Sequence, residues 1–307
     1  MGLTDAMTSN NNHISVCVCT YKRPHLLERL LDELSRQDTG ELFSYSIVVA
    51  DNDHLQSAEA VVLEFAAVSA VPIKYCVEPR QNIALARNKA IENSSGNFVA
   101  FIDDDEFPTP GWLLCLFKTC AVYQADGVVG PVKRHFDEKP PEWLVKGNFY
   151  ERPTYTTGMV IDWGQGRTNN LLFKKAIISE DTPPFRPEFR TGEDQDFFRR
   201  MIQEKHVFIW CDDAIVYEVV PPTRWKRTFM LRRALLQGTA AVLHPNFGAR
   251  DIAKSLIAIP AYIAALPFVF LWAHHTYMSL LIKLCDHIGR ILALMNINPI
   301  KEPYVTD

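Results

Sequence analysis

Four apolar runs in the first third of the chain have the length and composition of buried β-strands. They are ISVCVCTY at 14–21, SIVVADN at 46–52, PIKYCVEP at 72–79 and NFVAFID at 97–103. Each run is short, mostly apolar and followed by polar residues, as expected of strands that are covered on both faces. The pattern therefore predicts four strands of one sheet.

Segments with helical spacing separate these runs. After Pro24, leucines recur on one helical face, at Leu27, Leu30, Leu31 and Leu34. A second helix is predicted around 61–68, and a third over 82–94, ended by Gly96. Strands that alternate with helices predict a mostly parallel α/β sheet, flanked by helices on both faces and joined by right-handed crossovers.

Polar residues follow each predicted strand at the point where it ends. They are Thr20, Tyr21, Lys22 and Arg23 after the first strand, Asp51, Asn52 and Asp53 after the second, Glu78, Arg80 and Asn82 after the third, and Asp103, Asp104 and Asp105 after the fourth. Ligands of open parallel sheets bind beyond the carboxyl ends of the strands. Each group alone is also explained as turn chemistry, but four groups at one edge favour a ligand site.

The segment FIDDDEF at 101–107 places three carboxylates in succession after an apolar strand. Like charges this close repel unless a cation or a proton separates them, so the triplet suggests a metal site, with an acidic turn in water as the alternative. No GxGxxG follows the first strand and the chain contains no GxxxxGK[ST], which argues against a dehydrogenase or a P-loop enzyme. A bound diphosphate would be met by a metal and by Arg23, Arg80 and Arg87.

Composition narrows the class of protein further. With 307 residues, 48% of them hydrophobic, the chain can bury the core of one large domain with extensions. With a net charge of -4, the chain lacks the excess positive charge that nucleic-acid binding requires, so we do not expect nucleic acid as a partner. The seven cysteines lack CxxC and zinc-site spacing, which favours reduced thiols in the cytosol. Residues 1–13 lack the pattern of a signal peptide, and we expect them to form a short disordered lead at the N-terminus.

Six segments, in their order and spacing, resemble the inverting glycosyltransferases of family 2, which have the nucleotide-sugar-binding GT-A fold. They are CTYKRP at 19–24, VVADND at 48–53, NIALARNKAI at 82–91, FIDDDEFPTPGWL at 101–113, TNNLLFKK at 168–175 and TGEDQDFFRR at 191–200. The resemblance covers residues 14–225. It implies a Rossmann-like, mostly parallel sheet and the transfer of a sugar from a nucleotide donor with inversion at the anomeric carbon.

Carried over by position, the resemblance implies how the donor and the metal are bound. Asp103 and Asp105 match the outer residues of the DxD signature, with Asp103 near the ribose and Asp105 on Mg²⁺ or Mn²⁺. Asp104 lies between them and is grouped with the donor-binding residues, although the signature does not require it. Asp51 matches the residue that hydrogen-bonds the base. The remaining donor contacts that the resemblance implies are Thr20, Tyr21, Arg23, Asn82 and Arg87.

Two further positions carry expectations about catalysis. Acidic residues at a helix start are favourable partners of the helix dipole, which explains Glu193 and Asp194 without catalysis. The resemblance implies instead that Asp194 is the general base for the acceptor hydroxyl, with Glu193 supporting the acceptor site. Many relatives carry a metal- or diphosphate-binding histidine one strand later, where this chain has Glu218. We expect Glu218 to be a second metal ligand, with a mere strand-end charge as the alternative.

The C-terminal part changes composition abruptly. SLIAIPAYIAALPFVFLWA at 255–273 carries no charge and is close to the ~20 residues of a membrane span. YMSLLIKLCDHIGRILALM at 277–295 has the spacing of an interfacial helix, and RWKRTFMLRR at 224–233 suits anionic headgroups. A helical hairpin packed on the catalytic domain is nearly as well supported. The pattern predicts a lead at 1–13, a GT-A domain at 14–235 and a helical, membrane-associating extension at 236–307.

These features fit an enzyme at the cytoplasmic face of the bacterial inner membrane. The chain is similar to glycosyltransferases that build bacterial exopolysaccharide, including glucosyltransferases of the succinoglycan type. That resemblance implies UDP-glucose as the donor and a polyprenyl-diphosphate-linked saccharide as the acceptor.

Three other functions remain as alternatives. A sugar-nucleotide pyrophosphorylase should have a glycine-rich basic loop after its first strand, which CTYKRPHLL lacks. A glycoside hydrolase would need neither metal nor nucleotide. A non-catalytic nucleotide-sugar-binding relative would account for the departure at Glu218.

Overall fold

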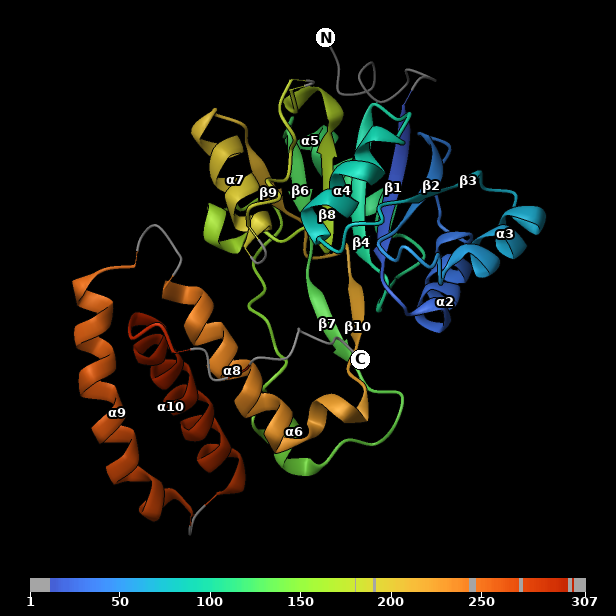
Figure 1. The fold of residues 1–307 in the computed structure, drawn as a ribbon. Helices are drawn as coiled ribbons and strands as arrows, with labels where there is room; N and C mark the ends of the chain where they lie inside the picture. The colour runs from blue at the N-terminus through green and yellow to red at the C-terminus, as the bar shows by residue number, and fades with distance from the viewer. Residues whose placement is uncertain are drawn as a thin grey trace. The chain divides into compact units, whose positions relative to one another are not determined.

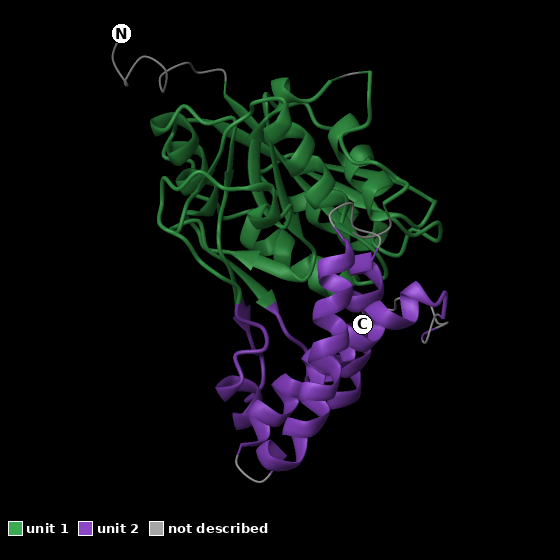
Figure 2. Cartoon of the chain, turned by 90° about the vertical axis from the view of Figure 1, so that its left-hand side faces the viewer, with its two compact units in different colours: residues 1–133, 152–218 green, residues 134–151, 219–307 purple. Residues whose placement is uncertain are grey.

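The chain folds into two compact units (Figure 2). The computed structural model describes residues 12–179, 181–189, 192–242, 247–270, 273–297 and 300. The first unit comprises residues 1–133 and 152–218, and the second comprises residues 134–151 and 219–307. The predicted disordered lead lies, up to residue 11, outside the described residues. The domain limits at 14–235 and 236–307 stay a prediction.

A seven-stranded sheet of order β3-β2-β1-β4-β8-β6-β9 forms the centre of the first unit. Its strands are β1 (His13–Thr20), β2 (Ser44–Asp51), β3 (Ile73–Val77), β4 (Phe98–Asp103), β6 (Gly127–Val129), β8 (Asn170–Lys174) and β9 (Phe208–Trp210). The first four are parallel, as predicted, and β8 runs antiparallel to β4 and β6. The predicted mostly parallel sheet is therefore confirmed.

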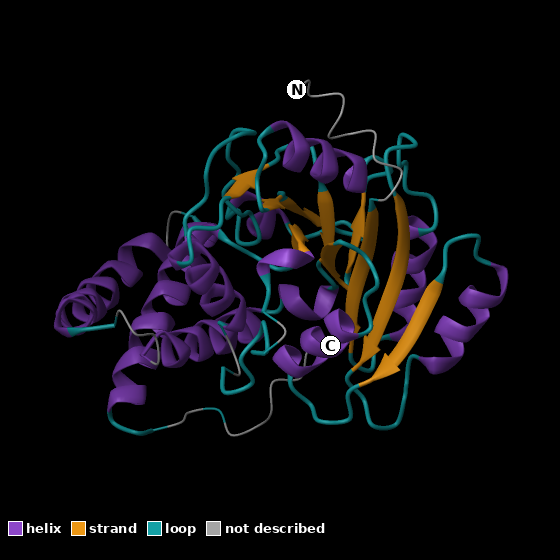
Figure 3. Cartoon of the chain, turned by 90° about the horizontal axis from the view of Figure 1, so that it is seen from above, coloured by secondary structure: helices purple, strands orange, loops and turns teal. Residues whose placement is uncertain are grey.

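Helices cover both faces of this sheet (Figures 1 and 3). They are α2 (Pro24–Leu34), α3 (Glu59–Val68), α4 (Ile83–Glu92), α5 (Trp112–Val122) and α7 (Glu193–Gln203), with short 3₁₀ turns at Trp163–Gln165 and Lys175–Ile177. Alternation along β1 separates two cores: Ile14, Val16 and Val18 pack with α2, α3 and α5, whereas Cys17 and Cys19 pack with α4 and α7. α4 and α7, on the second of these faces, carry Arg87 and Glu193 of the candidate site.

A small sheet extends the acidic segment. β5 (Glu106–Pro108) follows the carboxylate triplet and pairs antiparallel with β10 (Val216–Val219), so that Glu218 lies opposite Glu106. β7 (Val132–His135) belongs to the same sheet. This pairing brings a residue far along the chain next to the end of β4.

The second unit is helical. It contains α6 (Glu142–Lys146), the 3₁₀ turn Pro222–Trp225, α8 (Arg227–Val242), α9 (Ala249–Phe270) and α10 (His274–Leu294). A Cβ on Gly238 of α8 would lie 2.0 Å from the carbonyl oxygen of Asp286, and one on Gly289 of α10 would lie 2.3 Å from that of Leu235. Only glycine permits α8 and α10 to approach this closely.

α9 is the one helix among the described residues that is long and apolar enough to cross a membrane, judged by length and composition. Only 6% of the most apolar 18-residue stretch of this helix is buried inside the protein. Its exposed side chains include Leu256, Ile257, Ile263, Phe268 and Phe270. The predicted apolar helix is confirmed over residues 249–270, and residues 271–272 of the predicted run lie outside the described part of the chain.

Candidate active site

The carboxyl ends of β1, β2 and β4 lie side by side because these strands are parallel neighbours. Thr20 lies opposite Asp51 in the β1–β2 pair, and Cys19 lies opposite Asp103 in the β1–β4 pair. Figure 1 shows the carboxyl ends of these strands at one edge of the sheet, so the polar residues that follow them share that edge.

Asp104, in the middle of the triplet, is held from two sides. Thr20 Oγ1 donates to Asp104 Oδ2 at 2.7 Å, and the Arg23 guanidinium contacts Asp104 Oδ1 at 2.6 Å and Asp105 Oδ2 at 3.1 Å. Burial raises the pKa of Asp104 to about 7, although Arg23 acts to lower it. One guanidinium thus ties two neighbouring carboxylates together.

A fourth carboxylate, Glu106, directly follows the triplet and is hydrogen-bonded to the end of β4. Glu106 Oε1 accepts from Asn169 Nδ2 at 2.6 Å, and Oε2 accepts from the backbone N–H of Asp103 at 3.1 Å. Burial raises the pKa of Glu106 well above its usual value and that of Asp103 to about 6. Sequence reasoning left Glu106 out of the site, although its place directly after the triplet was a signal.

Glu218 lies beside these carboxylates and has a partner that the sequence did not indicate. Arg152 Nη2 donates to Glu218 Oε2. The Arg152 side chain is 33% exposed and that of Glu218 is 15% exposed. Arg152 lies in a loop with no recognisable motif, so only the folded chain reveals the pair.

The carboxylates at the end of β4 suit a divalent cation, but they do not form a complete set of metal ligands among the described residues. Carboxylate oxygens are the hard donors that Mg²⁺ and Mn²⁺ prefer. Among the residues that the structure describes, no three His, Cys, Asp or Glu side chains converge to hold an ion. Mg²⁺ is commonly bound by one or two carboxylates together with substrate phosphates and water. The residues therefore fit a cation whose coordination a diphosphate completes.

Asp51, predicted to hydrogen-bond the base, is fully buried at the end of β2. Its Oδ1 accepts from the Asp53 N–H at 3.0 Å, and its Oδ2 accepts from the Ala58 N–H and the Tyr75 hydroxyl at 2.9 Å each. These contacts brace the loop that follows β2.

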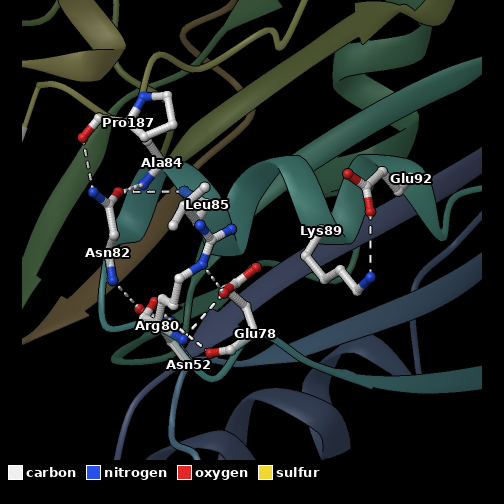
Figure 4. Close-up of polar contacts among 9 residues, drawn as sticks. All are labelled: Asn52, Glu78, Arg80, Asn82, Ala84, Leu85, Lys89, Glu92 and Pro187. Atoms are coloured by element: carbon white, nitrogen blue, oxygen red, sulfur yellow. Dashed lines mark hydrogen bonds and ion pairs between the residues drawn. The ribbon is translucent and has the colours of Figure 1, made fainter.

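Two asparagines connect the ends of β2 and β3 to the start of α4 (Figure 4). Asn52 Nδ2 donates to the carbonyls of Glu78 at 2.8 Å and Arg80 at 2.7 Å, and Asn52 Oδ1 accepts from the Asn82 N–H at 2.9 Å. Asn82 Oδ1 caps α4 by accepting from two backbone N–H groups of its first turn. Asn82 Nδ2 donates to the Pro187 carbonyl at 2.9 Å (Figure 4).

α4 also holds the segment that leads into α7. Asn88 Nδ2 donates to the Phe185 carbonyl at 2.7 Å, and the Phe185 N–H donates to Asn88 Oδ1 at 2.9 Å. Arg87 Nη1 donates to Glu193 Oε1, and both side chains are buried. Burial raises the pKa of Glu193, although Arg87 acts to lower it. A buried ion pair thus joins Glu193 at the start of α7 to α4.

Asp194 and Tyr21 stand apart from these networks in the described part of the chain. Asp194, in the first turn of α7, is partly exposed, and its Oδ1 accepts from the Gln195 N–H at 2.8 Å. Tyr21 is also partly exposed, and Lys22 Nζ lies 5.1 Å from the centre of its ring. Asp194 therefore has a solvent-accessible carboxylate next to the buried Glu193.

Residues 15–179, more than half of the chain, match the family described as "Glycosyl transferase family 2". The chain belongs to this family. The succinoglycan biosynthesis protein ExoM of Rhizobium meliloti (strain 1021) is 33% identical over 235 residues, which cover 76% of this chain and 75% of that protein. The chondroitin synthase of Escherichia coli is 30% identical, over 70% of this chain and 36% of that protein. The chain is therefore a glycosyltransferase.

Solved structures agree with the predicted GT-A fold. The mannosyltransferase PcManGT from Pyrobaculum calidifontis, in complex with GDP-Man and Mn²⁺, has a TM-score of 0.58 at 16% identity, covering 92% of this chain and 88% of that one. S. aureus TarS 1-349 in complex with UDP has a TM-score of 0.54 at 17% identity, covering 94% and 93%. At these identities the likeness concerns the fold alone, which is confirmed as an α/β GT-A sheet.

In this glycosyltransferase the predicted site residues form three contact groups. Thr20, Arg23, Asp104 and Asp105 form one, Arg87 and Glu193 another, and Glu218 with Arg152 the third. Asp51 and Asn82 are bound to backbone groups around them. The roles of these residues in binding and catalysis stay predictions.

The buried ion pair of Arg87 and Glu193 should contribute to stability, and two variants separate the effect of its charges from the effect of its packing. Arg87→Met leaves the Glu193 carboxylate buried without its cation, which should lower the free energy of unfolding by about 3–5 kcal/mol. Adding Glu193→Gln removes the stranded charge and should recover part of that loss. Urea unfolding followed by circular dichroism measures both.

Arg36→Met is the matched control, because Arg36 makes an exposed ion pair with Asp32. It should cost less than about 1 kcal/mol. A double variant no more stable than Arg87→Met would contradict the charge argument.

Proposed function

We propose that the chain is a metal-dependent, inverting glycosyltransferase that moves a sugar from a nucleotide donor to a hydroxyl group. The observation that carries this proposal is the edge of the sheet where Arg23 ties Asp104 to Asp105 beside the ends of β1 and β2, in a chain of glycosyl transferase family 2. Thr20, Asp51 and Asp103, which end β1, β2 and β4 at this edge, are the residues that we assign to the nucleotide.

Asp105 is the carboxylate that we assign to the cation. When bound, Mg²⁺ or Mn²⁺ would stabilise the negative charge of the departing nucleoside diphosphate. Arg23 orients Asp105 through the contact of 3.1 Å and offsets the repulsion within the triplet. Glu218 is the second predicted ligand, and its ion pair with Arg152 competes with that role.

Asp194 is the general base in this proposal. An acceptor hydroxyl is a poor nucleophile until a carboxylate takes its proton. Asp194 is partly exposed at the start of α7, where an acceptor can reach it, while Glu193 remains in the buried ion pair with Arg87. Attack opposite the leaving group would invert the anomeric centre.

Three similar proteins support the choice of substrates. ExoM is a succinoglycan biosynthesis protein, which supports a role in exopolysaccharide assembly. UDP-glucose is the donor that we propose. TarS has been solved with UDP and with UDP-GlcNAc, and PcManGT with GDP-Man and Mn²⁺, which supports a nucleotide-sugar donor and a divalent metal. A polyprenyl-diphosphate-linked saccharide is the acceptor that we propose.

The second unit supports a place at the cytoplasmic face of the bacterial inner membrane. α9 exposes apolar side chains along a length that matches the hydrocarbon core. Arg250 and Lys254 in its first turns are cations that suit anionic headgroups. An enzyme bound there would meet a lipid-linked acceptor without extracting it from the membrane.

Nucleotide binding is the test of the proposed donor site. Thermal unfolding with UDP, GDP or CMP, each with and without Mn²⁺, should show stabilisation by UDP that requires the metal, about 2.7 kcal/mol at one hundred times Kd. Asp105→Ala should abolish it, whereas Asp32→Ala, at an exposed carboxylate on α2, should not. No shift with any nucleotide in folded protein would exclude the proposed function.

Removal of the proposed base should stop transfer and leave donor binding intact. Asp194→Asn keeps the shape of the side chain but takes no proton, so kcat should fall by about 10²–10⁴. Transfer of radiolabelled glucose from UDP-glucose to lipid-linked saccharides measures kcat, and calorimetry measures UDP affinity. Asp212→Asn, at an exposed carboxylate, is the control. Unchanged turnover in Asp194→Asn would remove Asp194 as the base.

The proposed membrane contact is tested with charged substitutions on α9. Phe268 is 76% exposed, and Phe268→Asp should lower binding to vesicles of anionic phospholipid about tenfold or more, because burying a carboxylate in lipid is costly. Val68→Asp is the control, at an 84% exposed position of α3. Co-sedimentation measures both. Equal binding of the two variants would argue against contact through α9.

A further inference from the structure

Three guanidiniums surround one buried carboxylate at the start of α7. Asp196 Oδ1 lies 3.2 Å from Arg199 Nη2, and Asp196 Oδ2 lies 3.0 Å from Arg200 Nε. The third guanidinium comes from the segment before the helix, with Arg186 Nε at 3.7 Å from Asp196 Oδ2. The Asp196 side chain is only 2% exposed. Among the described residues, three positive charges thus meet a single negative charge.

The three arginines differ in how many of their donors are already used. Arg200 is 14% exposed, and it donates from Nε to Asp196 and from Nη2 to the Pro184 carbonyl. Arg200 alone therefore balances the charge of the carboxylate and ties α7 to the segment before it. Arg186 and Arg199 are 43% and 30% exposed, and each contacts the carboxylate through one nitrogen. Their other nitrogens have no acceptor in the described part of the chain and are accessible to solvent.

The backbone on both sides of Arg186 is held by α4. Phe185 exchanges two hydrogen bonds with Asn88, and the Pro187 carbonyl accepts from Asn82 Nδ2 (Figure 4). The second exposed guanidinium stands on α7 itself. Donors carried by elements that are already fixed lose less conformational freedom when a ligand binds. The two guanidiniums are therefore prearranged around Asp196.

Helix pairing explains only part of this cluster. Arg199 and Arg200 follow Asp196 at the i,i+3 and i,i+4 spacings of ordinary helical ion pairs. Arg186 comes from outside the helix, and it adds a positive charge to a carboxylate that is already neutralised. Three cations against one anion leave a formal excess of two positive charges, which repel one another unless an anion joins them. A phosphate group carries up to about two negative charges, and its oxygens match the planar fork of a guanidinium.

We propose that Arg186 and Arg199 bind a phosphate group of a ligand, at a site separate from the donor site, and that Asp196 positions both guanidiniums. Asp196 lies two residues after Asp194, about 200° around the helix axis. The phosphate site and the proposed base are therefore on different sides of the first turn of α7. The phosphate belongs either to a free anion or to the diphosphate of a lipid-linked acceptor. Only the second assignment rests on the proposed function.

Binding of two diphosphates without metal tests the inference. Inorganic pyrophosphate and farnesyl diphosphate are titrated by calorimetry in EDTA at constant ionic strength, so that a metal-dependent donor site does not contribute. Arg186→Gln and Arg199→Gln should each weaken binding several-fold, and the double variant should weaken it about tenfold or more, because hydrogen bonds between charged groups are lost. Arg36→Gln, which breaks an exposed ion pair on α2, is the matched control and should leave the affinity unchanged.

Comparison of the two diphosphates identifies the source of the phosphate. Tighter binding of farnesyl diphosphate than of pyrophosphate, lost in the double variant, would assign the site to a lipid-linked diphosphate. Tighter binding of pyrophosphate, lost in the same variant, would assign it to a free anion. Thermal unfolding shows that the variants are folded. Arg186→Gln and Arg199→Gln should melt close to the wild type, because Arg200 still balances Asp196 in each.

Two results would overturn the inference. One is the absence of binding of either diphosphate to the folded wild type, and the other is equal affinity of Arg36→Gln and of the single variants Arg186→Gln and Arg199→Gln. UDP binding with Mn²⁺ is measured independently of both. Loss of the phosphate site alone therefore leaves the proposed function standing, whereas absence of UDP binding removes the proposed function and leaves the phosphate site.

Discussion

Repulsion among carboxylates at the end of β4 is the constraint on which the arrangement of the site depends. Asp103, Asp104, Asp105 and Glu106 follow one another in the chain, and β10 adds Glu218 beside them. Buried like charges are unfavourable unless cations or protons offset them. Burial raises the pKa of Asp103 to about 6 and that of Asp104 to about 7, and the neighbouring Asp105 carboxylate adds to both shifts. The guanidiniums of the surrounding loops and α4, and in our proposal a divalent cation, offset it.

The second organising feature is α4, which links the carboxyl ends of β2 and β3 to α7. Its cap residue Asn82 is held by Asn52 from the end of β2, and its later residues Arg87 and Asn88 hold Glu193 and Phe185. Each contact uses a buried or partly buried polar group with a specific partner, so little freedom remains between the two halves of the site. The carboxylate of Asp194, next to Glu193, is thereby kept at a defined distance from the carboxyl ends of the strands.

Much of the fold and of the candidate site was predictable because the signals are local. Apolar runs with helices between them indicate a parallel sheet, and parallel neighbours such as β1 and β4 must bring Thr20 and the triplet to the same edge. Arg152 was not predictable in this way. It carries no motif, and its partner Glu218 is 66 residues away. Glu106 was visible in the sequence, but its bonds to Asn169 and the Asp103 backbone were not.

By itself, the sequence determined the class of the sheet, the edge at which chemistry is concentrated and the family, because periodicity and strand-end residues depend on neighbours in the chain. Only the tertiary structure decided which charges are compensated and by which partner. That distinction depends on distances of a few ångströms between segments such as β10 and the loop at Arg152, and on the burial that strengthens each interaction. Charge pairing is a property of the folded chain, since no spacing in the sequence specifies which guanidinium reaches which carboxylate.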